Sequence, residues 1–526
     1  MLVQLLDLFA FMSVLLRAFT LAFEALAVGG VFFRMAIARE SKLLDSRVIG
    51  FVTWFAVLLA ATQAAYVAAN SALLMESTGL TWPEVRGAAF CISGFLMMGG
   101  ALGIAIFARS RLARWLCPIG AFAILAGAVM SSHSMARLDH RWELAVLTVA
   151  HHAAGAAWIG GFPYLLLSLR RSDPAIAATI VARFSRMATI AVPVLVLAGL
   201  GMSLAYVGST AALTGTAYGI MLSSKAIMTV GLLLLGALNL RIVRAVRAGS
   251  TQSLLPLRRF AEAELGIGIT ILLAAASLTS SAPAVDVQQD RVTPKEIAER
   301  MAPKWPRLQT PPLSDLSPPT PLIPLSTPAS FVPGQTPQQP SKPGDIAWSE
   351  YNHNWAGLIV FAIGLLSLLA RRWSLARNWP LIFLGLAVFL LVRADPENWP
   401  LGPRSFWASF RVAEVAQHRL FVLLIVFFAA FEWCVQNGKV NPARAGLVFP
   451  LVCAVGGALL LTHSHSLGNV KEEFLAELSH TPIAILAVFA GWSRWLEVRH
   501  NPRYVRWIWP VCFILIGAIL MDYREA

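Results

Sequence analysis

The sequence predicts an all-α, polytopic transmembrane helical bundle of about fourteen spans, and two observations carry that prediction. Of its 526 residues, 57% are hydrophobic and only 13% are charged, which is too apolar for an ordinary soluble protein. Apolar runs near the roughly 20 residues that cross a bilayer recur along the whole chain. One such run could be a buried core helix, but a dozen or more indicate a membrane protein.

The expected spans are apolar runs bounded by charged or Pro-rich ends. They cover about residues 5–33, 49–74, 87–108, 115–133, 144–169, 187–208, 219–240, 261–281, 353–370, 379–393, 412–435, 445–462, 481–498 and 505–522. The first carries Asp7, Arg17 and Glu24 and lacks a basic n-region. It is therefore expected to be a retained helix rather than a signal peptide.

A Pro-rich segment divides the chain. Residues 282–350 include "PPLSDLSPPTPLIPLSTPASFVPGQTPQQPSKPG", a composition that predicts a disordered linker with no packed core. It separates an eight-helix unit, residues 1–281, from a six-helix unit, residues 351–526, and is expected to be periplasmic. The five cysteines stand singly, so buried thiols are expected rather than disulfides.

Basic residues predict how the bundle is oriented. The chain has a net charge of +14, but 25 Lys and Arg lie in alternate loops on one side, against 9 in the opposite short loops and C-terminus. This asymmetry is the positive-inside pattern, so the basic loops are expected to be cytoplasmic and both termini periplasmic. The charge reports membrane topology, and nucleic acid is not an expected partner.

Histidine is distributed unevenly on this topology. Nine of the ten histidines fall near the predicted periplasmic face, and only His500 is cytoplasmic. Neutral imidazole binds copper, zinc, nickel and iron, so its concentration at one face favours metal capture. A single interfacial histidine is more often a hydrogen-bonding residue, which is the expected role of His140 and His500.

The first unit combines thioether and imidazole groups. "MSSHSM" supplies Met130, His133 and Met135 after the fourth span, and "HHAAGAAWIGG" supplies His151 and His152 at the start of the fifth. Thioether beside imidazole favours copper, especially Cu(I). Adjacent helical residues point about 100° apart, so one of His151 and His152 is expected to ligate and the other to pack or hydrogen-bond.

The second unit holds the larger group of candidate ligands and pathway residues, expected to converge from four helix ends. The group comprises His353, Glu414 and His418, and then His463, His465, Glu472, Glu473, Glu477 and His480 from "THSHSLGNVKEEFLAELSH". The HxH pair is a compact bidentate option, whereas the three glutamates could also form a solvated loop face. Pro482 resembles a helix start, which would leave His480 outside the helix of Glu477 and disfavours a di-metal site.

Ionisable residues inside expected spans are costly and mark candidate pathway positions. Arg17 and Glu24, seven residues apart, share a helix face and are expected to pair with each other or with neighbouring helices. Lys225 lies just inside the seventh span, where it serves a pathway or snorkels outward. No nucleophile elbow, Walker loop, HExxH motif or dinucleotide fingerprint occurs in a credible context, so the chain is not expected to be an enzyme.

Part of the chain resembles a known family. The stretch "FSRMATIAVPVLVLAGLGMSLAYVGSTAALTGTAYGIMLSSKAIMTVGLLLLGALN" contains Phe184-Ser185, Gly199, Gly201, Tyr218-Gly219, Lys225 and Asn239, and upstream His152 precedes Trp158, Gly160 and Gly161. Over about residues 1–280 these features resemble the CopD family of bacterial copper-resistance inner-membrane proteins, and the second unit is similar to an extension of longer members. The resemblance implies copper movement across the inner membrane with a soluble periplasmic copper-binding donor protein. Tyr218 joins Lys225 as a candidate pathway residue.

Three functions stay open on the sequence. The first is copper transport, in the import direction, or copper delivery, with His and Met ligands capturing the ion at the periplasmic face. The second is a b-type haem redox protein, with His418 and either His463 or His152 as axial ligands. The haem function is disfavoured because all of the candidate axial histidines lie near one face of the membrane. The third is a factor that holds copper for oxidase assembly. Copper is the expected ligand, and haem b is the alternative.

Overall fold

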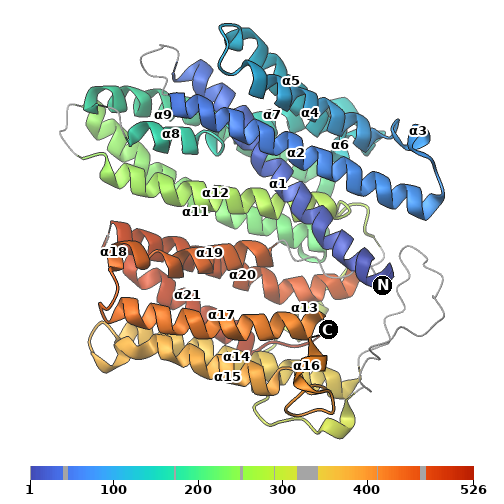
Figure 1. The fold of residues 1–526 in the computed structure, drawn as a ribbon, viewed down its shortest axis with the longest axis vertical. Helices are drawn as coiled ribbons and strands as arrows, with labels where there is room; N and C mark the ends of the chain where they lie inside the picture. Colours follow the sequence, from blue (N-terminus) through green and yellow to red (C-terminus); the bar gives the residue numbers. More distant parts are fainter. Residues whose placement is uncertain are drawn as a thin grey trace.

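The described residues of the computed structural model form a helical bundle. They are 2–38, 46–170, 173–248, 253–288, 291–316, 342–410, 413–461, 470–500 and 502–525, without the side chains of 2–11, 413, 414, 417, 470–473 and 476. The long helices lie side by side along one direction (Figure 1). β-structure in the described part is limited to one isolated bridge between Asn398 and Arg404. The prediction of an all-α polytopic bundle is confirmed at this level.

The elements fall before and after the Pro-rich segment. Those before its masked part are α1 (Leu2–Ala36), α2 (Ser46–Thr78), α3 (Trp82–Val85), α4 (Ala89–Phe107), α5 (Ala113–Met130), α6 (His133–Ala136), α7 (Arg141–Trp158), α8 (Phe162–Leu169), α9 (Pro174–Val207), α10 (Thr210–Thr214), α11 (Ala217–Arg247), α12 (Leu255–Ser280), α13 (Pro294–Arg300) and η2 (Leu313–Asp315). Those after it are α14 (Pro343–Leu369), η3 (Leu375–Leu381), α15 (Ile382–Arg393), α16 (Phe406–Ser409), α17 (Ala413–Gln436), α18 (Pro442–Ala445), α19 (Val448–Leu460), α20 (Val470–Arg499), η4 (Val505–Trp507) and α21 (Ile508–Met521).

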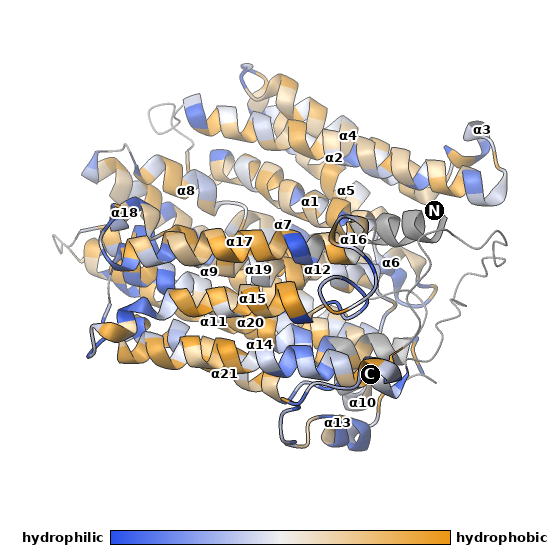
Figure 2. Cartoon of the chain, turned by 60° about the horizontal axis from the view of Figure 1, so that its bottom comes forward, coloured by the Kyte–Doolittle hydropathy of each residue, from blue (hydrophilic) through white to orange (hydrophobic). Residues whose placement is uncertain are grey.

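Apolar composition makes these helices suitable for a bilayer. In the described residues, 12 helical segments are long and apolar enough to span a membrane, and eight of them precede residue 281. Figure 2 shows apolar residues along the helices and hydrophilic residues gathered near their ends. Helices α20 and α21 coincide with the two remaining predicted spans, and the apolar helix at Val505–Met521 is shorter than the others. The count of fourteen therefore stays a prediction.

Both described ends of the chain lie at one end of the bundle, which we call the outer end; the opposite end is the inner end (Figure 1). Helices on either side of the Pro-rich segment form two layers that meet where α11 and α12 face α19 and α20. Small residues allow this contact, since Gly231 faces Phe489 and Gly266 faces the Trp492 ring. The division into two units stays a prediction.

Part of the predicted linker is structured. The structure describes its residues 282–288 and 291–316, and the expected disorder is wrong for the helix they contain. Helix α13 begins with Pro294 and has a capping box, in which Thr293 N donates to Glu296 Oε2 at 2.8 Å. The capping box pairs backbone N–H groups that the first helical turn leaves free, and the proline has no N–H group to pair. A helix of only seven residues can therefore form here. Residues 317–341 lie outside the described part.

Glycines bring α1 and α7 into close contact. A Cβ atom at Gly29 would collide with the Ala156 carbonyl oxygen, and one at Gly160 would collide with that of Ala25. The Tyr164 hydroxyl, just beyond α7, donates to the Leu26 carbonyl at 2.7 Å. Backbone-to-backbone approach of this kind is the use of small residues in membrane helices. It fixes α1 against α7 where both carry ionisable side chains.

Candidate functional site

A polar cavity lies inside the first eight spans. Its volume is about 60 Å³, and its wall includes Arg17, Glu24, Met97, His133 and His152. These residues come from α1, α4, α6 and α7. A buried water needs about 10–15 Å³, so the cavity has room for roughly four waters or for an ion with part of its hydration shell. Polar side chains from four helices therefore converge on a space of ionic size.

The centre of the cavity wall is an imidazole–carboxylate pair. His152 Nδ1 lies 2.8 Å from Glu24 Oε1, and the Glu24 side chain is only 4% exposed. An ionised carboxylate can only accept, so Nδ1–H donates to Glu24, and when the ring is neutral its Nε2 carries the lone pair that a metal ion needs. A carboxylate behind a histidine fixes the tautomer and orientation of a metal ligand. Glu24 Oε2 is buried and makes no hydrogen bond to the described residues.

Two further groups in the wall suit a soft metal. His133 Nε2 is buried and has no hydrogen-bond partner in the described part of the chain. Burial lowers the pKa of His133, and the positive charge of Arg17 lowers it further, so this imidazole is neutral at neutral pH. Met97, a residue that is 2% exposed, also lines the cavity and carries a thioether. Neutral imidazole and thioether are ligands that Cu(I) accepts.

Arg17 positions the outer part of the cavity. Its guanidinium donates to the Thr279 carbonyl at 2.6 Å and, more weakly, to the Ser131 carbonyl at 3.4 Å. Arg17 therefore pairs with the ends of α12 and α5, and Glu24 pairs with α7. Of the two alternatives expected for Arg17 and Glu24, pairing with neighbouring helices is the one that the structure contains.

The adjacent histidines of α7 diverge. The His151 Nδ1 atom lies 3.0 Å from the Leu195 carbonyl of α9, and the ring packs against Gly199. The two ring planes are 62° apart, so only His152 turns to the cavity. Both rings lie about 16 Å along α7 at 1.5 Å per residue, which is deeper than the outer-face position expected. Lys225, on α11, is within electrostatic range of both.

Other predicted residues of the first unit lie elsewhere. Tyr218 is 5% exposed and packs with Tyr206 and Leu144 in a small apolar cluster. Met130 and Met135 do not line the cavity; the cavity thioether is that of Met97, which the sequence argument did not select. The signal that could have found it is a Met inside the small-residue run "FLMMGG" of the third span.

In the second half, His418 pairs with a carboxylate, whereas the rings of His353 and His480 both contact Tyr523. His418 Nδ1 lies 2.8 Å from Asp395 Oδ1, and Asp395 was not predicted. The His353 ring stacks on Tyr523 with centroids 3.8 Å apart, and the His480 ring meets Tyr523 edge-on at 6.1 Å. In the described residues no three His, Cys, Asp or Glu side chains form a metal-binding group. Convergence of this half into one site therefore stays a prediction.

The helix that carries His480 differs from its prediction. Helix α20 runs from Val470 to Arg499 with Pro482 inside it, so Glu477 and His480 share one helix. The expected start at Pro482 is wrong, because preceding residues already form helical turns. Glu477 is buried and accepts a hydrogen bond from Thr481 at 2.8 Å. His463 and His465, and the side chains of Glu414, Glu472 and Glu473, lie outside the described part.

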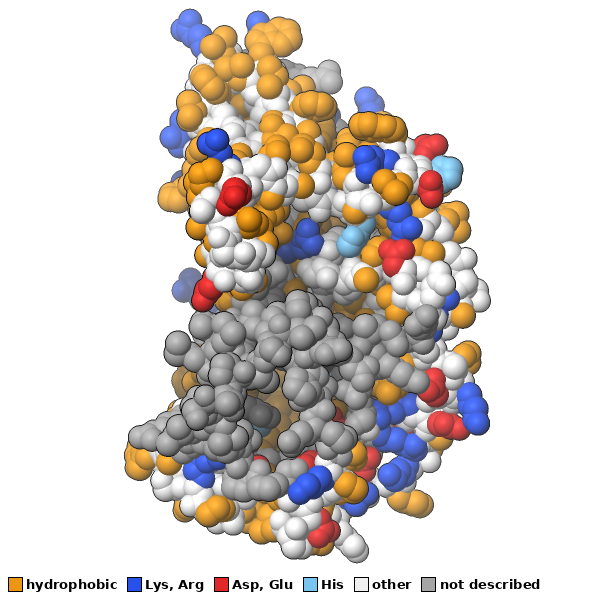
Figure 3. Space-filling view, turned by 90° about the vertical axis from the view of Figure 1, so that its right-hand side faces the viewer, with side chains coloured by type: hydrophobic (Ala, Val, Ile, Leu, Met, Phe, Trp, Pro, Cys, Tyr) orange, Lys and Arg blue, Asp and Glu red, His pale blue; other side chains and the backbone are white. Residues whose placement is uncertain are grey.

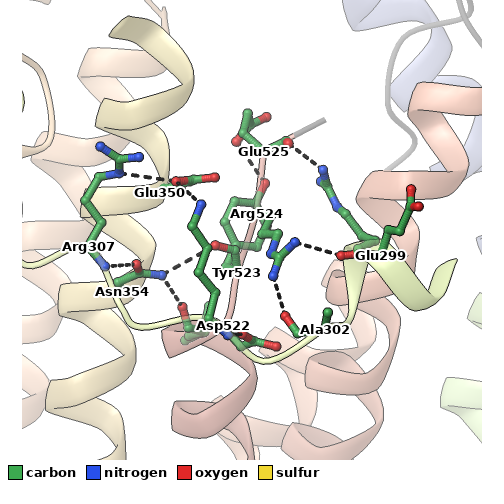
Figure 4. Close-up of polar contacts among 12 residues, drawn as sticks. Glu299, Ala302, Arg307, Glu350, Asn354, Asp522, Tyr523, Arg524 and Glu525 are labelled. Atoms are coloured by element: carbon green, nitrogen blue, oxygen red, sulfur yellow. Dashed lines mark hydrogen bonds and ion pairs between the residues drawn. The ribbon is translucent and has the colours of Figure 1, made fainter. Parts of the chain in front are cut away.

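At the outer end, polar contacts join the segment after α13 to the second half (Figure 4). Lys304 N donates to Asp522 at 3.0 Å, and Arg307 N donates to Asn354 Oδ1 at 2.6 Å. Arg524 donates to the Glu299 carbonyl at 2.7 Å. Figure 3 faces this end and shows basic, acidic and histidine side chains above the grey residues. These contacts tie the described part of the linker to α14 and the end of α21.

Comparison with known proteins adds a family to this geometry. Residues 178–278, from α9 to α12, match the family model "Copper resistance protein D", CopD. The predicted resemblance to the CopD family is thus confirmed over residues 178–278. This matched segment supplies Lys225 and the Leu195 carbonyl that holds His151. The cavity residues Glu24, Met97, His133 and His152 precede the matched range.

A curated relative matches about a third of the chain. "Copper transport protein CutJ" of Bacillus subtilis (strain 168) is 31% identical over 176 residues, which are 32% of this chain. The match spans 31% of the length of that relative. No solved structure matches this chain.

Proposed function

We propose that this protein carries copper ions across the membrane or delivers them to its inner side, and that the cavity of the first eight spans holds the ion on its way. The observation that carries the proposal is the Glu24–His152 pair, in which the carboxylate holds Nδ1 of an imidazole that lines a cavity together with His133 and Met97. The CopD match over residues 178–278 and the likeness to a copper transport protein support copper as the cargo.

The ligand set suits a passing ion. Structural metal sites are closed cages of four strong ligands, whereas this cavity offers two imidazoles, one thioether and a carboxylate held behind an imidazole. A sparse set of this kind binds Cu(I) without burying it irreversibly. The buried Glu24 carboxylate would offset the positive charge of the ion, which is expensive to bring into a bilayer.

We favour copper transport from the outer end of the bundle toward the inner end. The cavity wall includes Ser131, Ser132 and His133, which follow α5 at that end, and reaches Glu24 and His152 deeper in the bundle. The positive-inside pattern supports a periplasmic outer end, and the CopD match supports a bacterial inner membrane as its location. A soluble periplasmic donor would supply the ion there. His418, His353 and His480 would form a second point of capture, together with His463 and His465.

The test is copper uptake into proteoliposomes with the metal content of the purified protein measured in parallel. Uptake by the wild type and its loss in His152→Ala are the expected results. Bound copper without uptake would assign the protein to delivery or storage, and neither bound copper nor uptake would reject the proposal. A strong Soret band in the purified protein would favour the haem alternative instead.

A further inference from the structure

An arginine cluster bridges the two layers at the inner end. Arg258 and Arg259 lie in the first turns of α12, and Arg499 ends α20. All three surround Glu262: Arg259 Nη1 lies 2.6 Å from Oε1, and Arg258 Nε and Arg499 Nη2 each lie 3.6 Å from it. Trp495 Nε1 donates to the other oxygen, Oε2, at 3.1 Å. We call Arg258, Arg259 and Arg499 the interlayer arginine cluster.

The cluster carries more positive charge than its surroundings neutralise. Three guanidinium groups share one carboxylate, and Arg170, after α8, adds a fourth positive charge within electrostatic range of Arg258. The Nε atoms of all three cluster arginines are buried and make no hydrogen bond within the described residues. Glu262 is the shared partner of all three guanidinium groups, but one carboxylate neutralises only one of their three positive charges, so a further anion would stabilise the cluster.

Two other arginines, in the second half of the chain, also share a single carboxylate but are stabilised in another way. Arg371 and Arg494 share Glu497, but their guanidinium groups also lie over aromatic rings, Arg371 at 4.8 Å from Trp507 and Arg494 at 5.3 Å from Trp509. Cation–π contact stabilises desolvated arginine. In the interlayer cluster only Arg499 has such a contact recorded among the described residues, 5.6 Å over Trp495. Arg258 and Arg259 therefore depend more on an anion.

We propose that the interlayer arginine cluster binds the phosphate group of an anionic lipid. Guanidinium forks match the geometry of phosphate oxygens, and the first turn of α12 adds the positive end of its dipole. The cluster lies at helix ends, where lipid phosphates are concentrated, and basic pockets between membrane helices are typical headgroup sites. The side chains are 26%, 12% and 26% exposed for Arg258, Arg259 and Arg499, so a headgroup can reach them.

The bound phosphate would join the two layers. Arg258 and Arg259 belong to the first eight spans and Arg499 to the second half, so one headgroup neutralises charge from both. The site is far from the Glu24–His152 cavity along the helices, and the inference stands whether or not the protein carries copper.

The experiment counts lipids bound to the intact purified protein by native mass spectrometry. Phosphatidylglycerol, phosphatidylcholine and inorganic phosphate are added in separate arms. Each arginine near a lipid phosphate is worth about fivefold in affinity, so Arg259→Gln with Arg499→Gln should weaken phosphatidylglycerol binding by roughly 25-fold. The matched control is Arg111→Gln with Arg114→Gln, exposed arginines of the α4–α5 loop at the same end, which should change it little.

Glu262→Gln is a second test in case the double variant misfolds. It removes the carboxylate that all three arginines share among the described residues, so it should tighten lipid binding instead. Opposite shifts in the two variants support the site. Equal phosphatidylglycerol binding in the wild type, the double variant and Glu262→Gln would overturn it. Displacement of the lipid by millimolar inorganic phosphate would also overturn the lipid assignment, in favour of a soluble phosphate ligand.

Discussion

The Glu24–His152 pair allows the sharpest test of the copper proposal. Glu24→Gln keeps the shape of the side chain and its ability to accept from Nδ1, but removes the charge. The bond is 2.8 Å long and the carboxylate is 4% exposed, so little water screens it. Loss of a carboxylate behind a histidine typically costs 10- to 100-fold in metal affinity. For one buried bond of this geometry we expect about 30-fold, or about 2 kcal/mol.

The assay is competition for Cu(I) against a chromogenic chelator under reducing conditions, with thermal unfolding to verify the fold. Stability should change little, because removal of a buried charge offsets the weaker hydrogen bond from His152. Glu264→Gln is the matched control: this carboxylate is 2% exposed and accepts a hydrogen bond from Asn239, but it does not line the cavity. A folded Glu24→Gln protein that binds copper within threefold of the wild type would refute the reasoning.

Three further substitutions separate ligands from packing residues. His152→Ala should abolish copper binding in the cavity, whereas His151→Ala should retain it and cost about 1 kcal/mol of stability through the lost Leu195 contact, as copper titration and thermal unfolding would reveal. Met97→Leu preserves volume, so stability should fall by less than about 1.5 kcal/mol while Cu(I) affinity drops and Zn²⁺ affinity stays; equal loss for both ions would remove the thioether from the site. Gly160→Ala should destabilise the protein by about 1–3 kcal/mol because its Cβ meets the Ala25 carbonyl, and Gly99→Ala, with no neighbour within 4 Å, should be nearly neutral in the same melt.

The membrane architecture was predictable because it depends on composition and length. Apolar runs of sufficient length have few alternatives, and helices α1 to α12 follow the eight expected spans of the first unit closely. The effect of a single proline within a helical segment was harder to predict. Pro482 marked a helix start by its usual preference, but preceding turns extend the helix through it.

The candidate site was predictable only in part. Glu24 was selected because ionisable groups inside a span are expensive, and His152 because histidines gather near one predicted face; neither reason depends on helix contacts. Their pairing could not be derived, since it depends on how α1 crosses α7 at Gly29 and Gly160. Met97 could not be predicted as a ligand either, because its thioether becomes a candidate only when α4 is placed beside α1 and α7.

The depth of His152 has an electrical consequence. An ion that travels from the outer end to this imidazole passes roughly 16 Å along α7, about half of the 30 Å hydrocarbon core. A full crossing is worth about 2.3 kcal/mol per unit charge for each 100 mV, so half of it is about 1.2 kcal/mol. Occupancy by a monovalent cation should then change roughly sevenfold per 100 mV, and an energised membrane, negative inside, would itself draw the cargo inward.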